Sequence, residues 1–336
     1  YTDGGHLGTV SVATLDGQVA ETEIMAAARY SVHGQREFAR LGNGVELSRT
    51  YDADTLLVRR IEARRPTLGA RVRLLQDLRY TYDPVGNITS CEDLAHDPVG
   101  GGASAFFRTA PAASSARFYT YDPFYRLSGC EGRAHNALTA AAGPRPGFGL
   151  SDGSATERFV QSYTYDLSGN LTQLRHQGTA TNFTQDFWVD GASNRSRPAL
   201  GTDGLAYPNP AADFAVAGEM QQMDHIARLE WRHDQRLARA VVIDRSAQGL
   251  PDDDEVYLYD GGGNRMRRIM RRMLAGGIIE RIEVTYFAGG QRRRIFRDAQ
   301  MILERFTTRL SDGLSDVAEL YRWTRDTTAR ETDDIT

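Results

Sequence analysis

The side chains of this chain that could do chemistry as a group are tyrosines and aspartates, which recur in the order Tyr-x-Tyr-Asp. Two tyrosines separated by one residue leave the same face of a β-strand. Rings aligned in this way beside a carboxylate could stack on sugars, which would make the motif a carbohydrate-binding surface. The same residues could instead be structural, with the rings covering the sheet and the carboxylate accepting turn N–H groups. We favour the structural interpretation.

The motif occurs in four good copies and one partial copy. Three of the good copies continue into Gly-Asn at a fixed offset, and a fixed internal repeat indicates an architecture of repeated units. The motif residues are Tyr51 and Asp52 in the partial copy, and Tyr80, Tyr82, Asp83, Gly86, Asn87, Tyr119, Tyr121, Asp122, Tyr163, Tyr165, Asp166, Gly169, Asn170, Tyr257, Tyr259, Asp260, Gly263 and Asn264 in the good copies.

The copy at Tyr80 contains the residues of a β-hairpin turn. Asp83 is a favoured first residue of a type I turn, and Pro84 presets φ at the next position. Gly86 can take the positive φ that returns the chain into a second strand. We therefore expect a hairpin in which residues 73–82 pair with residues 87–92.

These copies resemble the YD repeats of the Rhs family and of the B and C components of Tc-type insecticidal toxin complexes. Segments ahead of the copies, such as Gly42-Asn43-Gly44-Val45 and Leu75-Gln76-Asp77-Leu78, fit the same pattern. The resemblance is clearest over residues 30–336, and the chain looks like the segment upstream of the Rhs core. It implies a spiralling β-sheet shell, a hollow cocoon around the toxic C-terminal part of the same polypeptide.

Together, the hairpin repeats and the resemblance predict an all-β fold in which YD-repeat hairpins form a curled, spiralling antiparallel sheet, part of a hollow shell. We expect one shell segment over residues 1–336. Residues 1–29 are a lead-in with a less defined pattern, where 17–29 suggest a short helix. Stretches rich in Gly, Ala, Ser and Pro near 97–117, 139–156 and 198–218 are interpreted as inserted loops.

Weaker repeats and later strands extend the same pattern. Residues 182–195 and 228–232 look like degenerate copies. Apolar residues within 266–273 have helical spacing, but the repeat context and the following Gly276-Gly277 turn favour a strand. Further strands are expected over 278–287, 292–297, 301–310 and 317–324.

Arginines form the one basic concentration, and strand alternation would send them to both faces of a sheet. We therefore expect them to pair with carboxylates of the sheet or of an enclosed cargo, and not to form a nucleic-acid patch. The cluster comprises Arg265, Arg267, Arg268, Arg271, Arg272, Arg292, Arg293, Arg294 and Arg297.

Three other sets of residues are given structural interpretations. Asp252 to Glu255 lacks the ligand pattern of a calcium loop and is expected to be a solvated turn ahead of a strand. The seven histidines have no metal-ligand spacing. Cys91 and Cys130 follow their repeat aspartates at the same offset, so a disulfide is conceivable, but unpaired buried thiols are favoured.

Whole-chain properties exclude some classes of function. The 40 basic and 44 acidic residues give a net charge of −4, so no general field attracts nucleic acid or anionic lipid. No apolar run has the length of a membrane span. The chain starts at Tyr1 without a signal-peptide pattern, and we interpret it as a piece of a longer protein.

The function that the resemblance implies is encapsulation of a C-terminal toxic effector and its protected delivery in a secreted bacterial toxin complex made in the cytoplasm. The implied partners are the Rhs core and C-terminal toxin of the same polypeptide and a translocation component, with no nucleic acid and no direct membrane insertion. We expect no catalytic, cofactor-binding or metal-binding residue in this segment, which is not an enzyme. The alternative is a cell-surface carbohydrate-binding or adhesion module built from the same repeats.

Overall fold

The computed structural model describes residues 1–2, 4–12, 22–65, 74–96, 113–135, 156–201, 203–311, 313 and 316–326. The chain divides into two compact units, Tyr1–Tyr207 and Pro208–Thr336. In the described residues, regular structure consists of β-strands and four short 3₁₀ turns, so the predicted all-β class is confirmed. Within the same residues no helix is long and apolar enough to cross a membrane.

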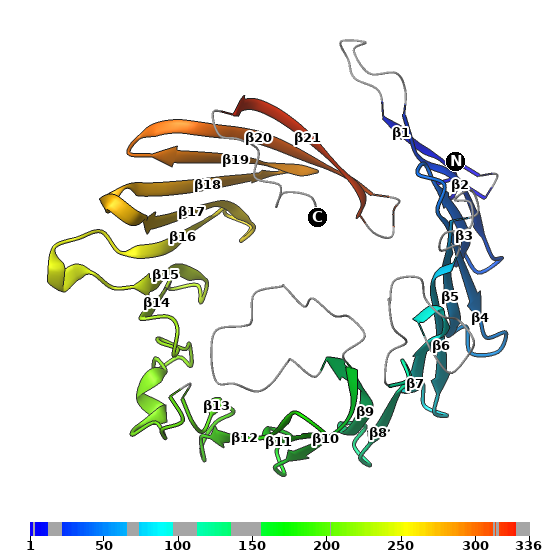
Figure 1. Cartoon of the computed structure of the whole chain (residues 1–336), viewed down its shortest axis with the longest axis horizontal. Helices are drawn as coiled ribbons and strands as arrows, with labels where there is room; N and C mark the ends of the chain where they lie inside the picture. The colour runs from blue at the N-terminus through cyan, green and yellow to red at the C-terminus, as the bar shows by residue number, and fades with distance from the viewer. Residues whose placement is uncertain are drawn as a thin grey trace. The chain divides into compact units, whose positions relative to one another are not determined.

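The first unit holds a 13-stranded sheet in which every strand pairs antiparallel with its neighbour in the chain. Figure 1 shows these strands following one another from β1 to β13 along a curved path. The strands are β1 Val10–Val12, β2 Thr22–Tyr30, β3 Arg36–Leu41, β4 Glu46–Tyr51, β5 Val58–Arg64, β6 Leu74–Tyr82, β7 Ile88–Asp93, β8 Arg117–Tyr121, β9 Leu127–His135, β10 Thr156–Tyr165, β11 Leu171–Gly178, β12 Asn182–Val189 and β13 Ser196–Pro198.

The second unit holds an 8-stranded antiparallel sheet, again in chain order. Its strands are β14 Arg228–Trp231, β15 Leu237–Ile243, β16 Asp253–Tyr259, β17 Arg265–Met273, β18 Ile279–Phe287, β19 Gly290–Arg297, β20 Gln300–Ser311 and β21 Asp316–Asp326. The four 3₁₀ turns are η1 Leu94–His96, η2 Pro210–Asp213, η3 Ser246–Gln248 and η4 Ala275–Gly277.

A β-bulge recurs immediately before the second tyrosine of each copy. The register shifts between Thr81 and Tyr82, and the same shift precedes Tyr51, Tyr121, Tyr165 and Tyr259. A bulge adds one unpaired residue to a strand and increases its local twist. The repeat therefore carries its own source of sheet twist at each hairpin.

Among the residues that the structure describes, neither sheet has a large apolar core. One buried cluster in the first unit consists of Met25, Ala28 and Ala39, with Leu47 and Tyr30 packed against it. Many other buried side chains are charged, and they include Asp77 and Glu62 in the first sheet and Asp254, Glu280 and Glu283 in the second. Isolated charged groups in an interior are costly, so these carboxylates require partners in the sheet.

Several sequence-based predictions can be compared with these strands. The short helix expected over residues 17–29 is wrong where the structure describes it, because Thr22–Tyr30 is strand β2. Its alternate residues Met25, Ala27 and Arg29 pair with β3, and burial of Met25 outweighs the helical spacing of the apolar residues. The strand predicted over 266–273 is confirmed by β17, and the hairpin predicted around Gly86 is confirmed by β6 and β7.

The interpretation of three stretches as inserted loops can be checked only in part. Most of the stretches near 97–117 and 139–156 lies outside the described residues. The third stretch, near 198–218, contains the isolated bridge Leu200–Ala206 and the turn η2 but no strand among its described residues after β13. That the whole chain forms one shell segment stays a prediction.

Candidate functional site

The aspartate of the YD motif organises each turn through its carboxylate. Asp83 Oδ1 accepts hydrogen bonds from the backbone N–H groups of Val85 at 3.0 Å and Asn87 at 2.8 Å. Its Oδ2 accepts one from Asn87 Nδ2 at 2.8 Å. The Gly86 N–H closes the turn onto the Asp83 carbonyl, with Gly86 at φ 96°. The Gly-Asn pair that follows the motif thus supplies the left-handed residue and a side-chain donor to the carboxylate.

The other good copies keep this geometry, and one of them replaces the asparagine donor. Asp166 with Asn170, and Asp260 with Asn264, repeat both contacts of the asparagine. In the second copy Arg126 takes the place of the asparagine and donates from Nε to Asp122 Oδ2 at 2.6 Å. The left-handed position, held by Gly86, Gly169 and Gly263 elsewhere, is occupied there by Tyr125 at φ 62°.

These hydrogen bonds stabilise the ionised carboxylates. The Asn87 side chain lowers the pKa of Asp83, and the Asn170 side chain lowers that of Asp166. In the partial copy, hydrogen bonds from Thr55 lower the pKa of Asp52 to about 2. An acid poised to donate a proton near neutral pH would have a raised pKa, so the turn aspartates have the electrostatics of structural groups and not of general acids.

The second tyrosine of each copy links its hairpin to the preceding hairpin. Tyr82 Oη donates to the Val58 carbonyl at 2.7 Å, and Val58 is the first residue of β5. The equivalent bonds run from Tyr51 to Arg36, from Tyr121 to Ile88, from Tyr165 to Leu127 and from Tyr259 to Leu237, each acceptor being the first residue of a return strand. The sequence analysis did not predict this role, although a tyrosine that recurs at the same position of every copy was the available signal.

The first tyrosine pairs across the hairpin with a residue of the return strand. Tyr80 lies opposite Cys91, and Tyr119 lies opposite Cys130. The shared offset of the two cysteines therefore reflects their places opposite equivalent tyrosines. Neither cysteine is in a disulfide, as the sequence favoured, but only Cys130 is buried and Cys91 is half-buried. Burial raises the pKa of each thiol and raises the pKa of Tyr80 to about 12.

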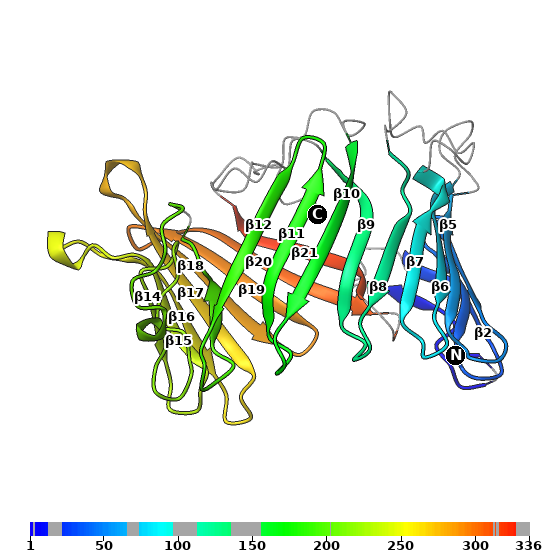
Figure 2. The same ribbon diagram turned by 90° about the horizontal axis from the view of Figure 1, so that it is seen from below.

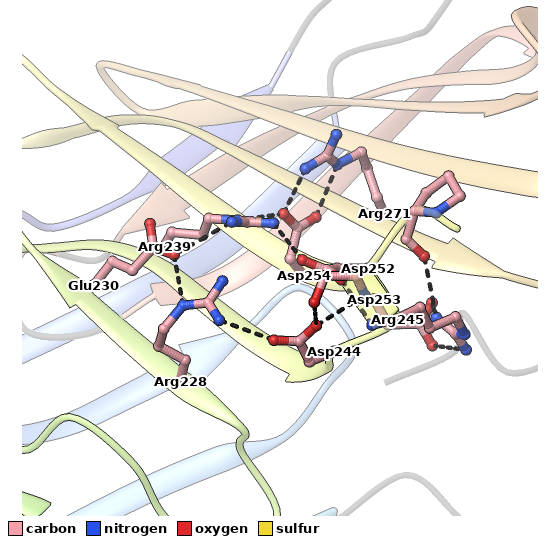
Figure 3. A network of polar contacts seen from close by, with 11 residues as sticks. Arg228, Glu230, Arg239, Asp244, Arg245, Asp252, Asp253, Asp254 and Arg271 are labelled. Carbon is pink, nitrogen blue, oxygen red and sulfur yellow. Dashed lines mark hydrogen bonds and ion pairs between the residues drawn. The ribbon is translucent and has the colours of Figure 1, made fainter. Parts of the chain in front are cut away.

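A network of arginines and carboxylates crosses the first strands of the second sheet (Figure 3). Asp254 on β16 is 1% exposed, and it accepts hydrogen bonds from Arg239 Nε at 2.6 Å and Arg271 Nε at 2.8 Å. Arg239 also reaches Asp252 at 2.9 Å and Glu230 at 3.3 Å. Burial alone would raise the pKa of Asp254, but the two arginines outweigh it and the pKa lies below its ordinary value.

The network overturns the expectation of a solvated turn and bears on the expected pairing of the arginines with carboxylates. Asp252 to Glu255 is not a solvated turn, because Asp253–Tyr259 is strand β16 and Asp254 is buried between arginines. Arg271 lies on β17, where neighbouring arginines alternate between the two faces. The carboxylate partners of arginines on β17 and β19 come from adjacent strands of the sheet, in the ion pairs Arg267–Glu283, Arg272–Glu280, Arg294–Glu304 and Arg297–Glu280.

One histidine is buried in the first sheet, between two aromatic rings. His176 on β11 stacks on Phe159 with centroids 5.1 Å apart and on Phe183 with centroids 4.9 Å apart. Burial lowers its pKa, and Glu157 opposes that effect in part. Within the part of the chain that the structure describes, no group of His, Cys, Asp and Glu side chains could hold a metal ion.

A small cleft lies between the first two YD turns, which are the turn of the partial copy at Asp52 and the turn of the next copy at Asp83. It has a volume of about 280 Å³ and is lined by Tyr80, Tyr82, Asp52, Asp83 and Arg59, among others. Two tyrosine edges with two carboxylates and a guanidinium are groups that could contact a sugar. The carboxylates are already engaged in their turns, and Tyr82 Oη is bonded to Val58.

The geometry and comparison with known proteins together identify the class of protein to which this chain belongs. The hairpins with aspartate-capped turns and tyrosine links define the chain as a YD-repeat β-sheet protein. No model of a known protein family matches the chain. It is 31% identical to toxin subunit YenC1 of Yersinia entomophaga over 300 residues, which are 88% of this chain and 29% of that subunit. It is 30% identical to toxin subunit YenC2 of the same organism over 261 residues, 74% of this chain and 25% of that subunit.

Solved structures agree with the sequence comparison. The crystal structure of TcdB2-TccC3 superposes with a TM-score of 0.82 and 26% identity over 97% of this chain and 15% of that chain. The Photorhabdus luminescens Tc holotoxin pore gives a TM-score of 0.79 and 28% identity over 94% of this chain and 14% of that chain. The chain is therefore homologous to subunits of Tc-type insecticidal toxins, and the resemblance seen in the motif is confirmed. It spans less than a third of each of these relatives.

Proposed function

We propose that this chain is a wall segment of a YD-repeat shell that encloses the toxic C-terminal part of its parent protein until delivery. The observation that carries the proposal is the agreement in fold with TcdB2-TccC3 across 97% of the chain. Homology to the toxin subunit YenC1 supports a role in a toxin complex. On this proposal the segment has a structural role and is not an enzyme.

The chemistry of the sheets suits a wall. A wall has two faces, and a sheet held by turn carboxylates, tyrosine links and paired charges does not need a second layer to cover an apolar face. Charges within the sheet are matched by its own groups, as Arg239 and Arg271 are by Asp254. Matched charges leave little to bind an enclosed chain tightly, which is useful when the cargo must later be released.

The proposal also assigns partners and location. The partners are the remaining parts of the same toxin polypeptide, including the Rhs core and the C-terminal toxin, and a component that translocates the toxin. The complex is secreted after synthesis in the bacterial cytoplasm. Toxin activity and self-cleavage reside downstream of this segment, and the segment needs neither nucleic acid nor direct insertion into a membrane.

The test uses the complete parent protein, compared on native and denaturing gels with intact-mass analysis. We expect a C-terminal fragment that is already cut, that comigrates with the shell on the native gel and that separates after denaturation. The fragment should resist added protease in the native protein and be degraded once the shell is unfolded. A single uncut chain with nothing beyond the repeats, or a fragment that protease removes from the native protein, would contradict encapsulation.

The cleft between the first two YD turns is the observation that favours the carbohydrate-binding alternative. Replacing Tyr80 by alanine would remove one of its aromatic walls. Saturable glycan binding by the native protein, lost in Tyr80→Ala and retained in Tyr125→Ala, together with the absence of an enclosed fragment, would favour adhesion over encapsulation.

A further inference from the structure

His176 on β11 is the central ring of a three-ring stack in the first sheet. Its imidazole lies between Phe159 on β10 and Phe183 on β12. Among the side chains that the structure describes it is the one buried histidine, at 6% exposed. Figure 2 shows β10, β11 and β12 side by side. The stack therefore joins the β11–β12 hairpin to β10 through the ring of a titratable residue.

Two polar side chains of β10 hold this imidazole in its neutral form. Tyr163 Oη donates to Gln161 Oε1 at 2.9 Å, which turns the Gln161 amide N–H₂ toward His176 Nδ1 at 3.1 Å. The imidazole thus accepts at Nδ1 and carries its proton on Nε2, which is buried without a hydrogen-bond partner. A second proton at Nδ1 would face the amide N–H, donor against donor, on a cation removed from water.

Few charged or titratable groups lie beside His176 on its face of the sheet. The register and the alternation of strand residues place Glu157, Tyr163 and Cys130 there, the first two from β10 and the last from β9. The described residues of β12 on that face include no titratable side chain. Tyr163 and Cys130 are uncharged near neutral pH, and Glu157 offsets the effect of burial on His176 only in part. A charged imidazole is therefore incompletely compensated.

Glu157 also attaches the β11–β12 turn to β10. Its carboxylate accepts hydrogen bonds from the backbone N–H groups of Ala180 at 2.5 Å and Thr181 at 3.1 Å. Gly178 leaves room for this carboxylate, because a Cβ there would lie 2.7 Å from Glu157 Oε1. The hairpin is therefore held on β10 at its turn by a permanent charge and along its strand by the ring stack.

Packing alone does not account for an imidazole at the centre of the stack. A phenyl ring at position 176 would stack on both neighbours and would leave no buried nitrogen without a partner. The imidazole differs from a phenyl ring in that it can take up a proton near neutral pH. The group that joins the hairpin to β10 is thus one whose charge depends on mild changes of pH.

We propose that the stack of Phe159, His176 and Phe183 is an acid-sensitive latch, which holds the β11–β12 hairpin on β10 at neutral pH and releases it when His176 is protonated. The inference concerns the sheet itself and goes beyond the proposed function. Burial lowers the pKa of His176 from its ordinary value of 6.5. A base whose pKa is lower in the folded state stabilises the fold fully above its unfolded pKa, and this contribution is lost as pH falls below that value. The latch is therefore closed above about pH 7 and loosens progressively below about pH 6.5.

The test is hydrogen–deuterium exchange of the complete parent protein at pH 7.5 and pH 5.5, read by peptide mass spectrometry and corrected for intrinsic exchange rates. We expect amides of β11 and β12 to lose protection by about three- to tenfold at pH 5.5. About tenfold is the limit, because pH 5.5 lies about one unit below the unfolded pKa. Amides of β17 and β18, which contain no histidine, are the internal reference.

Variants identify the group that takes up the proton. His176→Phe keeps three rings and removes the titration, so the protection of β11 and β12 should change no more than that of the reference strands. His225→Phe is the matched control, because His225 is exposed, and it should behave like the unchanged protein. Glu157→Gln should bring the loss closer to the tenfold limit, since it removes the one charge that favours the imidazolium and keeps an acceptor for the turn. The ratio of protection at the two pH values corrects for differences in stability between variants.

Three outcomes would overturn the latch. The first is an equal change of protection in the reference strands and in β11 and β12 of the unchanged protein. The others are a loss that persists in His176→Phe and a loss that Glu157→Gln reduces, and the second of these decides if His176→Phe does not fold. The fragment-retention gel at pH 7.5 tests encapsulation alone, so the latch and the proposed function can fail separately.

Discussion

A tyrosine hydroxyl is the group that makes one repeat depend on the one before it. Tyr82, Tyr121 and Tyr165 each donate to a carbonyl at the start of the preceding return strand, at 2.7 or 2.8 Å. In the degenerate copy at β14 an indole takes over, and Trp231 Nε1 donates to the Met220 carbonyl at 2.7 Å. Phenol and indole share an apolar body and one donor at its end, which is the combination that the position requires.

Replacing Tyr82 by phenylalanine tests this link with the ring kept in place. The change removes one donor and leaves the Val58 carbonyl short of it, so the free energy of unfolding should fall by about 1–2 kcal/mol. Tyr125→Phe is the control, because that side chain is 60% exposed and the change should stay within about 0.5 kcal/mol. Urea unfolding of both variants measures the difference. Equal midpoints for the two variants would show that the Tyr82 hydroxyl contributes no link.

At the scale of the element, charged pairs stabilise strands that in other sheets are held by an apolar core. β16 contributes Asp254, β15 contributes Arg239 and β17 contributes Arg271, so one carboxylate joins three adjacent strands. In the first sheet the carboxylate of Asp77 on β6 joins one neighbouring strand, through Arg60 Nε on β5 at 2.5 Å and Nη2 at 2.8 Å. Removing one member of such a group leaves the others desolvated and unmatched.

Asp254→Asn is therefore expected to lower the free energy of unfolding by about 2–4 kcal/mol, somewhat less than for a fully buried pair because both arginines are partly exposed. Glu319→Gln is the matched control, since Glu319 pairs with Arg309 at the surface and such pairs contribute about 0–1 kcal/mol. Denaturant unfolding followed by circular dichroism measures both. The network would be incidental if Asp254→Asn cost no more than the control.

The hairpins were predictable because their determinants are local. Asp83, Pro84 and Gly86 encode a turn within four residues, and the observed β6–β7 hairpin follows from them. Partners that lie on other strands were not predictable. The acceptor of Tyr82 is 24 residues away, and the arginines beside Asp254 are 15 and 17 residues from it. The helix expected over 17–29 is wrong at the described residues 22–29 for the same reason, because pairing of β2 with β3 outweighs local spacing.

At the scale of the whole molecule, the composition limits which side chains can change charge at alkaline pH. The sequence contains no lysine, and its arginines stay charged well above pH 10. The groups that titrate between about pH 9 and 12 are therefore the tyrosines and the two thiols. Burial raises the pKa of Tyr80 to about 12 and raises the pKa values of Tyr82, Tyr121 and Tyr163 from their ordinary value.

A tyrosine whose pKa is higher in the folded state than in the unfolded state stabilises the fold fully below its unfolded pKa of about 10. That contribution is lost as pH rises through the folded pKa, so the urea midpoint should fall steadily from about pH 10 to 12. The absorbance of tyrosinate should rise together with the loss of circular dichroism, because ionisation and opening of the sheet are linked. Tyr80→Phe should remove part of the pH dependence, whereas replacing Cys91 and Cys130 by alanine should leave most of it. A midpoint that is constant over this range, or one that follows the thiols, would mean that the tyrosine rows are not what alkali disrupts.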